Sequence, residues 1–74
     1  MNKQRRQKIR NVKNDIEKCI NYLQCLLDEE QDYFDNMPEN LQGSMRGSDS
    51  EEAVDIMESC IEDLEKVVEE LLSI

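Results

Sequence analysis

A chain of 74 residues, 36% of them charged, with three aromatic residues and no His or Trp, forms one small domain at most and buries little apolar surface. The formal net charge of −9 opposes non-specific binding to nucleic acids and membranes and favours cationic partners. The sequence has no His, no Cys-x-x-Cys pair and no glycine-rich phosphate loop, so the common motifs for nucleophilic catalysis, zinc and nucleotides are missing. We therefore expect a protein without enzymatic activity, metal or cofactor.

The first predicted element is a helix over about residues 3–35. Its apolar residues follow one another at alternating steps of three and four, the heptad spacing of a helix that packs on one side. They are Ile9, Val12, Ile16, Cys19, Leu23, Leu26, Tyr33 and Met37, with a polar gap at Glu30. Pro38 disfavours helical geometry at the residue before it, so the helix is expected to end near this point.

Residues 36–48 are predicted to form the connection, because they contain the only proline and both glycines. Three apolar residues spaced by four predict an irregular helical turn that either covers the open end of the core or binds a partner. They are Met37, Leu41 and Met45. Ser48, followed three residues later by Glu51, predicts a capping box at the start of the next helix.

A second helix is predicted over about residues 49–73, with a stripe of the same spacing. The stripe comprises Ala53, Met57, Cys60, Leu64, Val67, Leu71 and Ile74. Folding this helix back on the first pairs positions whose numbers sum to about 87, which places Leu23 near Leu64. The predicted fold is all-α: residues 1–74 form one coiled-coil-like, antiparallel two-helix hairpin. Cys19 and Cys60 are expected in its seam and Cys25 outside it, with no disulfide.

Each predicted helix also carries a second apolar ridge at seven-residue intervals. The six residues are Ile20, Leu27, Phe34, Val54, Ile61 and Val68. We expect a lone hairpin to leave this ridge exposed, although burying each side chain would contribute roughly 1.5–3 kcal/mol. The sequence therefore predicts a homodimer that forms a four-helix bundle. The alternative is that the ridge binds a different protein.

The beginning of the chain is basic, with seven Lys or Arg residues among the first eighteen. Residues before about Asn14 are expected to extend past the end of the second helix, where Glu65, Glu69 and Glu70 would offset the positive charge. An alternative function is nucleic-acid binding, in which these cations contact phosphates. The candidates are Lys3, Arg5, Arg6, Lys8 and Arg10. No apolar run exceeds three residues, so we expect a cytoplasmic protein without a membrane span.

Residues 19–74 are strongly acidic, with sixteen carboxylates against two basic residues. Two Glu-x-x-Asp pairs, Glu29 with Asp32 and Glu52 with Asp55, are expected near the loop end of the hairpin. Magnesium-dependent nucleotide pyrophosphohydrolases of helical fold use such pairs, which gives a less favoured enzymatic alternative. The favoured interpretation is a surface that binds a protein, in its sharpest form by imitating the charge of DNA. The candidate residues are Glu29, Asp32, Asp35, Met37, Leu41, Met45, Glu52 and Asp55.

The connection has the sequence EEQDYFDNMPENLQGS over residues 29–44 and precedes an acidic helix of the type EEAxDxxExxIxxLE. With the basic first turn, these features resemble a group of short uncharacterised helical-hairpin proteins encoded by bacteriophages, prophages and other mobile elements. The likeness extends over nearly the whole chain; the three cysteines and Met45-Arg46-Gly47 depart from it. The resemblance implies a phage or mobile-element setting and the cytoplasm of a bacterial host, and it assigns no activity to any residue.

Overall fold

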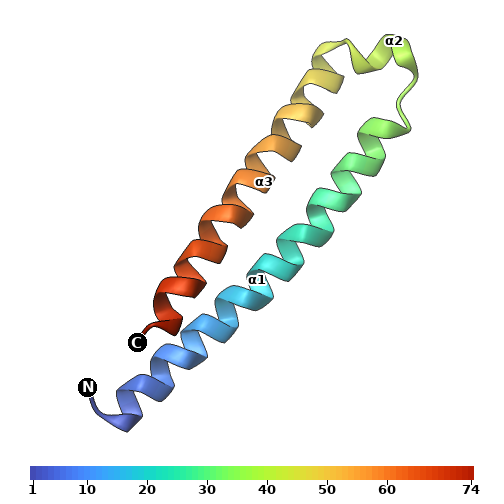
Figure 1. Cartoon of the computed structure of the whole chain (residues 1–74). Helices are drawn as coiled ribbons and strands as arrows, with labels where there is room; N and C mark the ends of the chain where they lie inside the picture. Colours follow the sequence, from blue (N-terminus) through green and yellow to red (C-terminus); the bar gives the residue numbers. More distant parts are fainter.

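The computed structural model describes residues 1–74 and contains three helices: α1 (Lys3–Asp35), α2 (Glu39–Gln42) and α3 (Met45–Leu72). The two long helices run antiparallel beside each other, and α2 bridges them at one end (Figure 1). The molecule measures 59 × 15 × 12 Å, so it is a rod only two helices thick. This architecture confirms the predicted all-helical hairpin. No helix combines the length and apolar character needed to cross a membrane.

Hydrogen bonds of neighbouring residues define the two ends of helix α1. The side-chain oxygen of Asn2 accepts a hydrogen bond from the backbone N–H of Arg5 at 2.7 Å, which caps the first turn. At the other end the backbone N–H of Asn36 donates to the carbonyl of Asp32 at 3.0 Å. Pro38 follows and has no N–H to continue the helix. These groups position α2 immediately beyond α1.

Helix α3 begins four residues earlier than predicted. Ser44 is its N-cap: its carbonyl accepts from the N–H of Ser48 at 2.9 Å, and its hydroxyl accepts from the N–H of Gly47 at 3.4 Å. The predicted start at Asp49 and the predicted capping box of Ser48 are therefore wrong. Ser48 lies inside the first turn because Ser44 supplies the cap before it.

The connection folds α2 against the start of α3. The side-chain amide of Gln42 donates to the backbone carbonyl of Phe34 at 3.2 Å and ties α2 to the end of α1. Among the three apolar residues of this segment, Met37 is buried, whereas Leu41 is 36% exposed and Met45 is 81% exposed. Of these three residues only Met37 is therefore buried.

The core between α1 and α3 is formed by the ridge that was predicted to mediate self-association. Leu27, Val54 and Ile61 are buried together, and Ile20 packs against them with Leu23 and Met57. Phe34 and Val68 are half-buried. The prediction that these residues form a free surface is wrong, because the hairpin itself covers them.

The predicted seam is correspondingly displaced. Cys19 and Cys60, expected inside, are exposed free thiols, as is Cys25. Leu23 and Leu64 line one hollow and Leu27 and Ile61 another, so the two helices lie in the predicted register. The axial alignment was thus predicted, and the rotation of each helix about its axis was not. Both rotations bring branched aliphatic side chains such as Leu27 and Ile61 inside in place of the smaller Cys19 and Cys60, and burial of the larger apolar surface contributes more free energy.

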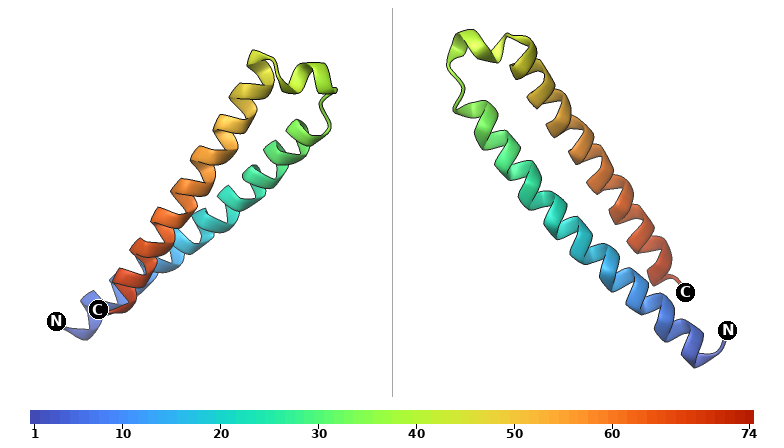
Figure 2. Two further views of the ribbon diagram at one scale, coloured as in Figure 1. Left: turned by 45° about the horizontal axis from the view of Figure 1, so that its top comes forward. Right: turned by 180° about the vertical axis from the view of Figure 1, so that it is seen from behind.

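Few polar contacts join the two long helices. Ser50 is 5% exposed, and its hydroxyl donates to the carboxylate of Glu30 at 2.9 Å; this is the only side-chain hydrogen bond between α1 and α3. The only ion pair links Lys13 and Glu17 within α1, at 3.0 Å. The predicted pairing of the basic first turns with carboxylates of α3 is not found. The beginning of the basic segment extends beyond the end of α3, as predicted, and the two views in Figure 2 show this overhang.

Candidate functional site

One side of α3 carries a continuous row of carboxylates, which we call the acidic row. It comprises Glu51, Asp55, Glu58, Glu62, Glu65 and Glu69. The steps of four and three match those of the buried residues Val54 and Ile61, so the row follows the edge of the core along the helix. All six side chains are exposed, and none forms an ion pair. The row is therefore free to meet cations of another molecule.

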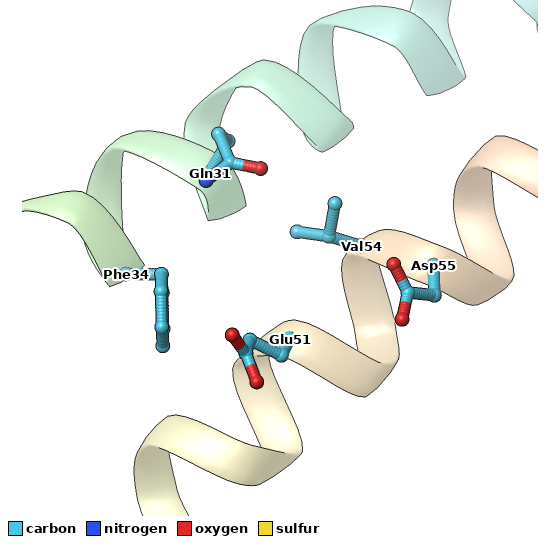
Figure 3. Close-up of a pocket in the computed structure, with 5 residues that line it drawn as sticks. All are labelled: Gln31, Phe34, Glu51, Val54 and Asp55. Carbon is cyan, nitrogen blue, oxygen red and sulfur yellow. The ribbon is translucent and has the colours of Figure 1, made fainter. Parts of the chain in front are cut away.

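At the loop end, the acidic row borders a pocket of about 230 Å³ between the helices. Figure 3 shows Glu51, Val54 and Asp55 projecting from α3 towards a space bordered by Gln31 and Phe34 of α1. The amide nitrogen of Gln31 donates to Asp35 at 2.9 Å, which leaves its amide oxygen as a further acceptor. The pocket therefore combines apolar walls with an acidic rim.

The same arrangement recurs one heptad further along the hairpin. A second pocket of about 220 Å³ is lined by Gln24, Leu27, Glu58, Ile61 and Glu62. Each residue lies seven positions from its counterpart in the first pocket, and the Gln24 amide donates to Asp28 at 3.1 Å, as that of Gln31 does to Asp35. Seven residues of helix advance by about 10.5 Å. The hairpin thus presents two equivalent pockets at this spacing.

The chemistry of these pockets matches a Lys or Arg side chain. The aliphatic stem of such a side chain can lie against Phe34 and Val54, or against Leu27 and Ile61. Its cationic head then meets two carboxylates and an amide oxygen at the rim. In the first pocket the ring of Phe34 also offers a cation–π contact.

The opposite side of the hairpin carries apolar residues that are exposed or half-buried, and we call it the apolar face. It comprises Val12, Cys19, Tyr22, Leu26 and Tyr33 of α1, with Ala53, Met57, Cys60, Leu64 and Val67 of α3. Tyr22 is 69% exposed and Val12 is 52% exposed. One hollow on this face is lined by Cys19, Tyr22 and Leu64, and a second by Leu26, Tyr33 and Met57. These hollows show that apolar side chains of both helices meet on one surface.

The two predicted carboxylate pairs do not converge. Asp55 belongs to the acidic row, whereas Glu29 borders the hollow of Leu26 and Tyr33 on the apolar face. Glu52 lies about 160° around α3 from the buried Val54, so it points away from α1. Asp32 and Asp35 are also exposed. No group of three or more carboxylates or thiols is arranged to hold a metal ion.

The five basic residues between Lys3 and Arg10 are all exposed. Lys3, Arg6 and Arg10 share one side of α1, while Arg5 and Lys8 lie on others. None of these five forms an ion pair. The predicted nucleic-acid candidates are therefore accessible but are distributed around the helix.

Half of the residues that line the two pockets were not among the predicted site residues. The omitted ones are Gln24, Gln31, Glu51, Glu58 and Glu62. A signal for them exists, because Glu51, Asp55, Glu58 and Glu62 recur at the steps of Val54 and Ile61. That signal depends on knowing which apolar ridge is buried. Comparisons with protein-family models, with curated proteins and with solved structures found no match to this chain.

Proposed function

We propose that this chain is a non-enzymatic accessory protein that binds a basic protein partner through its acidic row. The single observation that supports the proposal best is the repetition of one pocket at an interval of one heptad. Chance acidity scatters carboxylates, whereas here two carboxylates, one amide and two apolar residues recur together. A partner with two Lys or Arg residues about 10 Å apart, seven positions apart on a helix, would fill both pockets.

The setting belongs to the same proposal. The resemblance of residues 29–44 to short phage, prophage and mobile-element proteins favours a role in the cytoplasm of a bacterial host. Within that setting, a DNA-binding or defence protein is the proposed partner class, because its phosphate-binding surface is cationic. The acidic row would occupy that surface in place of nucleic acid. We further propose that the chain acts as a homodimer, through a surface other than the predicted ridge, which is covered within one hairpin.

The proposal is tested by removing charge inside and outside the first pocket. Glu51→Gln with Asp55→Asn neutralises the rim, and Glu65→Gln with Glu69→Gln removes the same charge from the far end of the row. Tagged chains would be incubated with bacterial lysate, and retained proteins identified by mass spectrometry at increasing salt. We expect a specific basic protein that is held by the unmodified chain and the far variant, is lost from the pocket variant, and dissociates as salt rises. Equal retention by all three chains, or no specific retention, would contradict the proposal.

A second candidate function is nucleic-acid binding by the beginning of α1, which its unpaired and exposed cations favour. Charge reversal at Arg5, Arg6 and Lys8 would then abolish binding to a labelled DNA duplex. For the unmodified chain, a plot of the logarithm of DNA affinity against the logarithm of salt concentration would have a negative slope, of about 0.9 for each phosphate contacted. Undetectable DNA binding by the unmodified chain would exclude this candidate.

A further inference from the structure

The apolar face lacks a partner within the chain. Only four hydrophobic residues are buried in the hairpin, whereas this opposite face exposes Tyr22, Leu26, Tyr33 and Val67 by 38–69%. On α1 the face extends from Val12 to Tyr33, which corresponds to about 32 Å of helix. A surface of this length and composition is expected to be covered by another apolar surface.

We infer that a second copy of this chain covers the apolar face, with the two loops at opposite ends of the resulting four-helix bundle. The inference deepens the proposed self-association by naming its surface and orientation. It replaces the ridge of Leu27 and Ile61, which is already buried within one hairpin.

The distribution of charge selects this orientation. Residues 28–59, the loop half, carry eleven acidic residues and one basic residue, a net charge of −10. Residues 1–27 and 60–74, the open half, carry eight basic and seven acidic residues, a net charge of +1. Loops at the same end would place −10 beside −10, whereas loops at opposite ends place each acidic half beside the basic segment of the other copy.

The apolar face also matches itself in this orientation. When α1 lies antiparallel on α1 of the second copy, Val12 of one copy faces Tyr33 of the other, and Cys19 faces Leu26. Both pairs fit one alignment because each is centred on the same point along α1, between residues 22 and 23. Lys18 borders the hollow of Tyr22, and Glu29 borders the hollow of Tyr33. These opposite charges come close across the interface only when the copies are antiparallel. The acidic rows remain on the two outer sides of the bundle, available to partners.

The surface is tested by placing a carboxylate on each side of α1. Leu26→Glu puts charge in the centre of the apolar face, and Asn21→Glu is the matched control, since Asn21 is exposed about 140° around the helix. Circular dichroism would show that both variants stay helical. In light scattering we expect a dimer for the unmodified chain and for Asn21→Glu, and a monomer for Leu26→Glu. A dimer that survives Leu26→Glu would overturn the assigned surface.

The orientation is tested by a distance between loops. The three cysteines would be replaced by Ala, retention of the dimer checked by light scattering, and a spin label attached through Met45→Cys, a position that is 81% exposed. Loops at opposite ends predict a label separation above about 40 Å in pulsed electron resonance. A separation below about 25 Å would show loops at the same end and overturn the orientation alone. A monomeric unmodified chain would overturn both self-association and this inference, while partner capture by the acidic row is measured separately.

Discussion

Gly47 occupies the corner at which α2 meets the first turn of α3, and it is buried there. A Cβ atom built on it would lie 2.5 Å from the carbonyl carbon of Gln42 and 2.6 Å from the carbonyl oxygen of Leu41. These are backbone atoms, so no side-chain rotation relieves the overlap. The small size of this glycine is what lets α2 pack directly on α3.

Gly47→Ala is therefore expected to lower the free energy of unfolding by about 2 kcal/mol or more, because α2 must move away from α3. Gly43→Ala is the matched control: no atom lies within 4 Å of the place that its Cβ would take, and the φ of −85° at this position suits any residue. We expect this change to raise the free energy of unfolding by about 0.4–1 kcal/mol, because alanine lowers the conformational entropy of the unfolded chain. Urea unfolding followed by circular dichroism measures both. Equal effects of the two changes would argue against the close packing at Gly47.

At the scale of the element, each long helix has an apolar surface wider than one seam. Three rows of apolar residues run along α3, and the structure buries the row of Val54 and Ile61 most deeply. The row of Cys60 and Val67 is exposed on the apolar face. The rotation of α3 therefore decides which row stabilises the single hairpin and which is available to another molecule.

Two isoleucines on α3 test this rotation. Ile61 is 6% exposed, whereas Ile56 is 54% exposed. Ile61→Ala is expected to cost about 2–4 kcal/mol of stability, because it removes buried apolar contacts and leaves a cavity. Ile56→Ala is expected to change stability by less than about 0.5 kcal/mol. Both are measured by urea unfolding at one protein concentration, since association would shift the midpoint. A larger loss of stability for Ile56→Ala than for Ile61→Ala would show that the row of Val54 and Ile61 does not form the core.

At the scale of the whole molecule, repulsion between carboxylates opposes folding. The net charge is −9, and within one hairpin the only ion pair that salt can weaken is Lys13 with Glu17, which is worth a few tenths of a kcal/mol at most. Screening of the acidic half should outweigh the loss of this pair.

Raising sodium chloride from low to moderate concentration is therefore expected to increase the melting temperature by about 2–5 °C. The measurement is thermal unfolding by circular dichroism at fixed protein concentration. A variant with Asp49→Asn, Glu52→Gln and Glu58→Gln has less repulsion in the loop half, so its melting temperature should respond less to salt. A decrease of the melting temperature with salt would show that attractive charge contacts dominate instead.

The secondary structure could be predicted at most positions because it depends on local spacing. The heptad steps and Pro38 belong to single segments, and α1 has the bounds that were predicted from them. The start of α3 was missed because Ser44 and Ser48 are both acceptable caps. The choice between them depends on whether α2 can pack against the following turn, which is a contact between segments.

The sequence by itself determined the all-helical class, the two long helices, their antiparallel register and the separation of a basic beginning from an acidic remainder. These properties follow from periodicity and charge order, which do not depend on distant contacts. Only the tertiary structure decided that Leu27 and Ile61 lie inside and Cys19 and Cys60 outside. The predicted seam and the observed core each bury an apolar stripe. They differ by a rotation of each helix about its own axis that is smaller than the roughly 100° between successive residues. That rotation is set by how well the side chains of both helices pack together, and it brings Glu51 and Asp55 to the rim of a pocket with Phe34.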